Sequence, residues 1–243
     1  MEQFDYSNSH IGKGEKYDSR FQSPSLYLMW EQEKTILMNH LHRYNPKNIL
    51  DLACGTGRIS NFIAKNYPFA DVTGVDISKS MLEVASKSST ERITYIQSAV
   101  KEFNLVKSEE PFDFITCFRF FTNAQEDLRL EMIKCAARHS GPDTIFLLNN
   151  HQNMNSLPLR LQNFRLKEKH GTKNSHIEVV ANKFDFHLIG TFSLGITPQD
   201  EVKFLLGTKL SRRIEKLNSR FLSRRHQLGI NQIMAFQMKR EMQ

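Results

Sequence analysis

The stretch DLACGTGRIS, residues 51–60, brings an acidic residue, two glycines and a polar helix start together in one short segment. The run NILDLA, residues 48–53, is typical of a buried strand, and RISNFIAKNY, residues 58–67, has apolar residues at helical spacing. Glycine lets the backbone approach a ligand, and a helix N-terminus offers free N–H groups. The stretch therefore predicts a ligand-binding turn between a strand and a helix.

Two acidic residues define the ligand of this turn. Asp51 lies four residues before Gly55, where its carboxylate would repel the pyrophosphate of a dinucleotide but attract an ammonium or sulfonium group. Asp76 ends the next expected strand, 19 residues after Gly57, where an acidic side chain typically binds the ribose hydroxyls. The third glycine of the dinucleotide pattern is replaced by Ser60. A ligand with a ribose and a cation but no phosphate is S-adenosylmethionine (SAM).

Strands alternate with helices along most of the chain. Strands are expected at 48–53, 71–76, 93–98, 112–118, 143–150, 186–196 and 231–240, and helices at 25–44, 58–67, 126–139 and within 199–226, with shorter ones capped by Ser78 and Ser175 and one near 157–166. This alternation predicts a parallel sheet with helices on both faces. We expect a lead-in and helix over 1–47 and one domain over 48–243, with a lid or substrate loop at 151–174 and a basic segment at 199–243.

The motifs ILDLACGTGRI and GVDIS resemble the first and second motifs of the class I SAM-dependent methyltransferases, and the resemblance extends over roughly residues 48–150. It implies an α/β Rossmann-like sandwich of three layers, with a seven-stranded, mostly parallel sheet whose last strand is antiparallel. It also implies an enzyme that transfers a methyl group from SAM. By this resemblance Asp51 contacts the methionine amino group, Asp76 the ribose, and Ser98 the adenine amine, where the family often has an acid. The expected cofactor-binding residues are Asp51, Ala53, Cys54, Gly55, Thr56, Gly57, Asp76, Ile77, Met81, Ser98, Ala99, Val100 and Phe118.

Candidate catalytic and acceptor-binding residues follow the fourth and fifth strands. The segment CFRFFTNAQ, residues 117–125, leaves the carboxyl end of a strand, which faces the ligand crevice in such sheets. We expect Arg119 to be catalytic or to bind the substrate, and Asn123 to bind it. His151 is a candidate general base, although a hydrogen-bonded loop histidine fits the sequence equally well. Tyr17, in the polar lead-in, is expected to fold over the site and contact the substrate.

The basic charge is concentrated at the C-terminus. The net charge is +7, and residues 201–243 alone hold ten Lys or Arg against three Glu. Within 209–227 the apolar residues Leu210, Ile214, Leu217 and Phe221 share one face of an expected helix. That face packs on the domain in one interpretation. In others the basic face binds an anionic acceptor, or RNA, through phosphate contacts.

The preferred acceptor is a small polar or sugar-type molecule, anionic acceptors included. RNA methylation and a non-catalytic, SAM-binding regulatory module are the alternatives, and a dehydrogenase is the least favoured. Three cysteines without CxxC spacing predict neither disulfides nor a metal site. No apolar run reaches the length of a membrane span, and the first thirty residues contain no signal-peptide apolar run. Reduced cysteines in a cytoplasmic protein are therefore expected. The oligomeric state is left open.

Overall fold

The computed structural model describes residues 18, 22–104, 110–156, 159–160, 171–197, 207–221 and 228–239, without the side chains of 218–221. Seven strands form one sheet in the order β3-β2-β1-β4-β5-β7-β6. The strands are β1 (Asn48–Leu52), β2 (Asp71–Asp76), β3 (Ile93–Gln97), β4 (Phe112–Cys117), β5 (Ser140–Asn150), β6 (Phe186–Leu194) and β7 (Asn231–Met238). This is the predicted Rossmann-like sheet, and its last strand is antiparallel as predicted.

The topology places a crevice at the carboxyl ends of the central strands. Strands β3, β2, β1, β4 and β5 pair in parallel, whereas β7 runs antiparallel to both β5 and β6. After β1 the chain moves to β2 on one side, and it later returns to β4 on the other side of β1. In open α/β sheets, ligands bind at such a switch point. The tips of β1 and β4 are therefore the expected ligand site.

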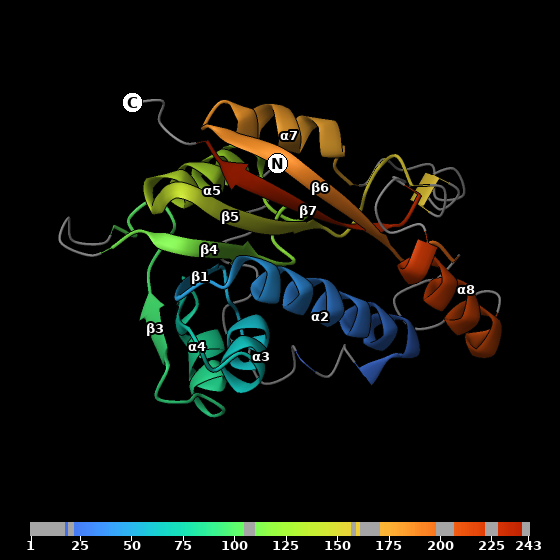
Figure 1. Ribbon diagram of the computed structural model, residues 1–243, viewed down its shortest axis with the longest axis horizontal. Helices are drawn as coiled ribbons and strands as arrows, with labels where there is room; N and C mark the ends of the chain where they lie inside the picture. Colours follow the sequence, from blue (N-terminus) through green and yellow to red (C-terminus); the bar gives the residue numbers. More distant parts are fainter. Residues whose placement is uncertain are drawn as a thin grey trace, which may run out of the picture.

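Helices cover both faces of the sheet (Figure 1). They are α2 (Pro24–Tyr44), α3 (Arg58–Asn66), α4 (Lys79–Ser86), α5 (Glu126–Arg138), α7 (Asn174–Asn182) and α8 (Thr208–Phe221). Helices α2, α3 and α4 lie on one face, α5 and α7 lie on the other, and α8 lies beyond the end of α2 (Figure 1). The hydrophobic core accordingly consists of two clusters, one on each face of the sheet. One cluster joins α5 and α7 to the sheet through residues such as Met132 and Ile177, and the other joins α2 and α3 through Leu37 and Ile63.

Several element boundaries differ from the prediction. Strand β5 begins at Ser140 instead of residue 143, because Ser140 already pairs with Phe112 ahead of a register shift. Ser78 stands at the N-cap of α4, but its hydroxyl contacts the Ser80 hydroxyl (3.2 Å) instead of a backbone N–H. Helix α7 has Lys173 at its N-cap, so the predicted cap Ser175 is the second residue of the helix.

The 151–174 segment is described only in part. Most of the helix expected near 157–166 lies outside the described residues. Within that range the structure describes residues 159–160, and both are helical. None of the helices in the described part of the chain is both long and apolar enough to cross a membrane.

Helix α8 does not bury the face that the sequence favours. Leu210 and Leu217 are 51% and 56% exposed, whereas Ser211 and Glu215 are buried. The Glu215 carboxylate accepts hydrogen bonds from the backbone N–H groups of Gly195 (3.2 Å) and Thr197 (2.8 Å). Because buried N–H groups require an acceptor, this polar contact outweighs burial of the leucines. The prediction of an apolar packing face was therefore wrong for these leucines.

Candidate active site

The turn after β1 has a backbone suited to close approach by a ligand. Ala53, Gly55 and Gly57 all have positive φ, at 54°, 55° and 73°. A side chain at Gly57 would lie 2.8 Å from the Ala85 Cβ and would also meet the Tyr95 hydroxyl, so glycine is required there on two grounds. The Gly55 N–H donates to the Asp76 carboxylate (2.8 Å). The two motifs predicted from the sequence are thus joined directly.

Asp51 is buried at the tip of β1, with an exposed fraction of 1%. Its carboxylate accepts hydrogen bonds from the Ser60 hydroxyl (2.6 Å) and the Thr116 hydroxyl (2.8 Å). Burial raises the pKa of Asp51 to about 6, because these two hydrogen bonds offset only part of the desolvation. A buried carboxylate of this kind is stabilised in its charged form by a cationic ligand.

A cavity of about 310 Å³ opens beside the turn. It is lined by Asp51, Ala53, Cys54, Gly55, Thr56, Arg58, Ile59, Val75, Asp76, Ile77, Ser78, Met81, Ser98, Ala99, Val100, Lys101, Phe118, Arg119, Phe120, Gln125, Asp127 and Leu128. Twelve of the thirteen residues predicted to bind the cofactor are in this lining, and Gly57 is the exception. The cavity joins the tips of β1, β2 and β4, as the switch point requires.

The tips of β2 and β3 form the wall around Asp76. The second Asp76 oxygen accepts the Ser78 N–H (2.9 Å), so the carboxylate also orders the start of α4. Ile77 is 44% exposed although it is apolar, and it lines the cavity. The Ser98 N–H donates to the Asp76 carbonyl (3.0 Å), which fixes Ser98 beside this wall. A polar carboxylate next to an exposed apolar side chain suits a ribose joined to an aromatic base.

The predicted acceptor-binding and catalytic residues are not all brought together. Arg119 lines the cavity, whereas Asn123 is exposed on a turn and His151 is half-buried, and neither of these two is in the lining. Tyr17 lies outside the described residues. Of the acceptor-side candidates in the described part of the chain, Arg119 is the one that reaches the cavity.

Cys54 is a neutral bystander at the turn. Burial raises the pKa of its thiol well above the usual value, and the neighbouring Asp51 and Asp76 carboxylates raise it further. A thiol is nucleophilic only as a thiolate. The site therefore offers no cysteine nucleophile at this position.

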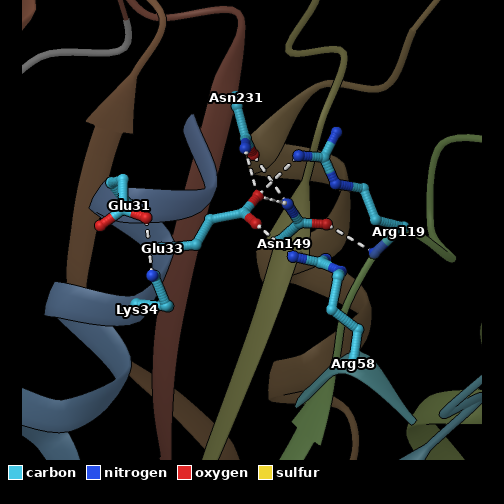
Figure 2. Close-up of polar contacts among 7 residues, drawn as sticks. All are labelled: Glu31, Glu33, Lys34, Arg58, Arg119, Asn149 and Asn231. Carbon is cyan, nitrogen blue, oxygen red and sulfur yellow. Dashed lines mark hydrogen bonds and ion pairs between the residues drawn. The ribbon is translucent and has the colours of Figure 1, made fainter. Parts of the chain in front are cut away.

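A buried ionic cluster that the sequence analysis did not identify adjoins the cavity (Figure 2). Glu33, on α2, has a fully buried side chain and binds Arg119 Nη2 (2.8 Å) and Arg58 Nη1 (3.2 Å). The Nδ2 atoms of Asn231 (2.8 Å) and Asn149 (3.3 Å) donate to the same carboxylate. Burial alone would raise the pKa of Glu33, but Arg119, Arg58 and the Asn231 hydrogen bond together lower it. Glu33 is therefore a buried carboxylate held in its charged form.

Other lining residues also escaped the sequence analysis. Arg58 directly follows Gly57, and that position at the helix start was the one local signal that could have identified it. Gln125 ends the segment 117–125 that the sequence singled out, whereas Lys101, Asp127 and Leu128 line the cavity from segments with no motif.

Comparison with known proteins supports the predicted resemblance. Residues 49–143 match the model of a family described as a methyltransferase domain. The chain is 32% identical over 120 residues to a demethylmenaquinone methyltransferase of Thermotoga maritima, a match that covers 47% of this chain and 50% of that protein. It is 34% identical over 116 residues to a ubiquinone biosynthesis O-methyltransferase of Coxiella burnetii, a match that covers 41% of this chain and 48% of that protein. The chain thus spans about half the length of the curated relatives it matches.

The fold is also found in solved structures. The magnesium protoporphyrin IX methyltransferase of Synechocystis, solved with bound S-adenosylhomocysteine (SAH), superposes with a TM-score of 0.64 at 12% identity, over 95% of this chain and 96% of that one. The resemblance to class I methyltransferases is therefore confirmed by the family match over residues 49–143 and by the fold over nearly the whole chain.

Proposed function

We propose that this chain, whose residues 49–143 match a methyltransferase domain, binds SAM in the cavity at the tips of β1, β2 and β4 and transfers its methyl group to a small polar acceptor. The observation that carries the proposal is the pairing of two carboxylates on one glycine turn. Asp51 is buried and suits the ammonium of the methionine group, while Asp76 holds Gly55 and lines the cavity where a ribose would lie.

The chemistry asks little of the protein beyond binding and orientation. A nucleophilic atom of the acceptor attacks the methyl carbon in line with the carbon–sulfur bond. The electron pair of that bond passes to sulfur, and the products are the methylated acceptor and SAH. Orientation of two reactants in this way contributes about 7–11 kcal/mol to catalysis. Residues that hold the cofactor and exclude water are therefore the main catalytic devices of the proposed mechanism.

An anionic acceptor is supported by the cations near the cavity. Lys101 lines it. The exposed basic residues of α8 are Lys209, Arg212, Arg213 and Lys216. Because β7 is antiparallel to both β5 and β6, β6 runs parallel to β5, and their carboxyl ends lie at the same edge of the sheet as the cavity. Glu215 of α8 binds the loop that follows the carboxyl end of β6, so α8 lies at this edge as well. An acidic small molecule approaching along this edge would be attracted by the exposed basic residues of α8.

Proton removal is needed only if the acceptor loses a proton on methylation. Neither His151 nor any other histidine is in the described lining of the cavity, so we assign proton transfer to no histidine. Arg58 and Arg119 are both ion-paired with Glu33, so Lys101 is the cavity cation that we assign to the acceptor side, through charge-assisted hydrogen bonds. A carboxylate or phosphate acceptor would need no base at all.

The proposal is tested with SAM labelled in its methyl group, the purified chain and fractionated cell extract. Label in small, polar, RNase-resistant material is the expected result. Label in RNase-sensitive material would replace the proposed acceptor by RNA. Binding of SAM without transfer to any fraction would favour a regulatory SAM-binding module. Asp76→Ala is the matched inactive variant, because it loses the contact with Gly55.

We also propose a cytoplasmic location. Cys54, Cys117 and Cys135 are buried as free thiols in the structure. Free cysteines of this kind are typical of a reducing compartment. Fractionation of cells that express the chain, with antibody detection, would test the location directly.

A further inference from the structure

Glu33 accepts contacts from four side chains that lie far apart in the sequence (Figure 2). Arg58 is the first residue of α3 and Arg119 follows β4, whereas Asn149 is next to the last residue of β5 and Asn231 is the first residue of β7. All four reach the one carboxylate, at distances between 2.8 and 3.3 Å. Glu33 itself comes from α2, outside the 49–143 stretch that matches the methyltransferase family. The helix that precedes the matched stretch therefore reaches the wall of its cavity.

The two arginines are held from more than one direction. The backbone of Arg119 has the left-handed conformation, with φ 62°. Its backbone N–H donates to the Asn149 Oδ1 (2.7 Å), and its guanidinium binds Glu33. The Arg58 guanidinium carbon lies 4.1 Å from the centroid of the Trp30 ring, and Trp30 is also on α2. Long arginine side chains lose much rotamer entropy when they bind a ligand. Here that cost is met in the folded protein, before any ligand arrives.

Both arginines belong to the lining of the cavity that also holds Asp51. Arg58, Arg119 and Asp51 all line it, and the Arg58 charge is close enough to favour the ionised form of Asp51. An ammonium at Asp51 belongs to an amino acid group in SAM, so a carboxylate lies next to it. A planar guanidinium in fixed orientation is the group best suited to bind a carboxylate.

Building on the proposed function, we propose that Glu33 is a positioning residue for the cofactor. It holds Arg58 and Arg119 so that their guanidiniums receive the carboxylate of SAM, next to the ammonium at Asp51. Helix α2 is then part of the cofactor site, and its docking and cofactor binding stabilise each other.

The test compares two ligands by isothermal titration calorimetry. SAH and 5′-methylthioadenosine share the adenosine and the thioether, but 5′-methylthioadenosine lacks the amino acid group. Glu33→Gln removes the charge at nearly constant volume. We expect it to weaken SAH about tenfold or more, the effect of a lost charge-assisted hydrogen bond, and to change 5′-methylthioadenosine by less than about twofold.

The chain offers a matched control on the same helix. Glu31 is 41% exposed and forms an ion pair with Lys34 (2.6 Å) that lies apart from the cluster (Figure 2). Glu31→Gln removes the same charge two positions earlier and is expected to leave both affinities unchanged. Glu33→Asp, which retains the charge on a shorter side chain, is expected to recover part of the SAH affinity.

Several outcomes would overturn the positioning role. Equal weakening of both ligands would mean that Glu33 only stabilises the fold, and unchanged SAH affinity would mean that the arginines do not need it. Stronger SAH binding would mean that Glu33 competes with the ligand for them. If Glu33→Gln does not fold, Arg119→Lys replaces it, with the same expected loss confined to SAH. A wild-type chain that binds neither ligand would instead refute the proposed function.

Discussion

The burial of Asp51 predicts that cofactor binding depends on pH. With a pKa of about 6, the Asp51 carboxylate is about nine-tenths ionised at pH 7 and about one-tenth ionised at pH 5. An ammonium group binds only the ionised form favourably. We therefore expect the affinity for SAH to fall about tenfold from pH 7 to pH 5, which corresponds to about 1.4 kcal/mol.

The assay is calorimetric titration of SAH at pH 5, 6 and 7, with circular dichroism to verify that the protein stays folded. Asp51→Asn retains the volume and can still bond Ser60 and Thr116, and it should bind SAH weakly with no such pH dependence. The affinity for 5′-methylthioadenosine, which has no ammonium, should not change through Asp51. A pH dependence that survives in Asp51→Asn, or that is equal for both ligands, would refute the reasoning.

The same carboxylate makes the ligand-free protein sensitive to pH. The pKa of Asp51 is about 6 in the folded state but near 4 in the unfolded chain, so the folded state binds more protons between these values. The contribution of Asp51 to stability is therefore fully present below about pH 4 and is lost as the pH rises through about 6, a change of about 3 kcal/mol. Urea unfolding of Asp51→Asn should lack this loss and give a more stable ligand-free protein at pH 7. Equal pH profiles for the two proteins would contradict the assignment.

Three further substitutions test the remaining parts of the site and fold. Gly57→Ala should lower the free energy of unfolding in urea by about 2–4 kcal/mol, because the new side chain clashes with its neighbours at a position of positive φ. Gly207→Ala, at φ 79° in open space, should lower it by only about 1–2 kcal/mol. Glu215→Ala should destabilise by about 2–4 kcal/mol by leaving two backbone N–H groups without their acceptor, and the exposed Glu83→Ala should change little. His151→Ala should retain SAH affinity by calorimetry, since His151 is not in the described cavity lining; a loss above about threefold would count against that placement.

The cofactor turn could be predicted from the sequence because its determinants are local. Asp51, Gly55 and Gly57 lie within one strand–helix unit, and Asp76 ends the next strand of the same parallel sheet. Their spacing alone indicates how they meet. The Glu33 cluster has no such signal, because its partners Arg119 and Asn231 are 86 and 198 residues away in the chain. Only the docking of α2 on the sheet brings them together.

Helix α8 shows a second limit of sequence patterns. The periodicity of Leu210 and Leu217 predicts a buried apolar face, and it does so correctly for most amphipathic helices. Here the loop after β6 presents backbone N–H groups that Glu215 satisfies, and the helix is rotated to bury that glutamate. The requirement arises from the tertiary position of the loop, so the helical pattern alone does not contain it.

The most direct test of the account is a crystal structure of the chain with SAH. We expect the SAH ammonium at Asp51, the ribose hydroxyls at Asp76 and the carboxylate at the guanidiniums of Arg58 and Arg119. Density for SAH outside the cavity between β1, β2 and β4, or with its amino acid group directed away from Asp51, would contradict it.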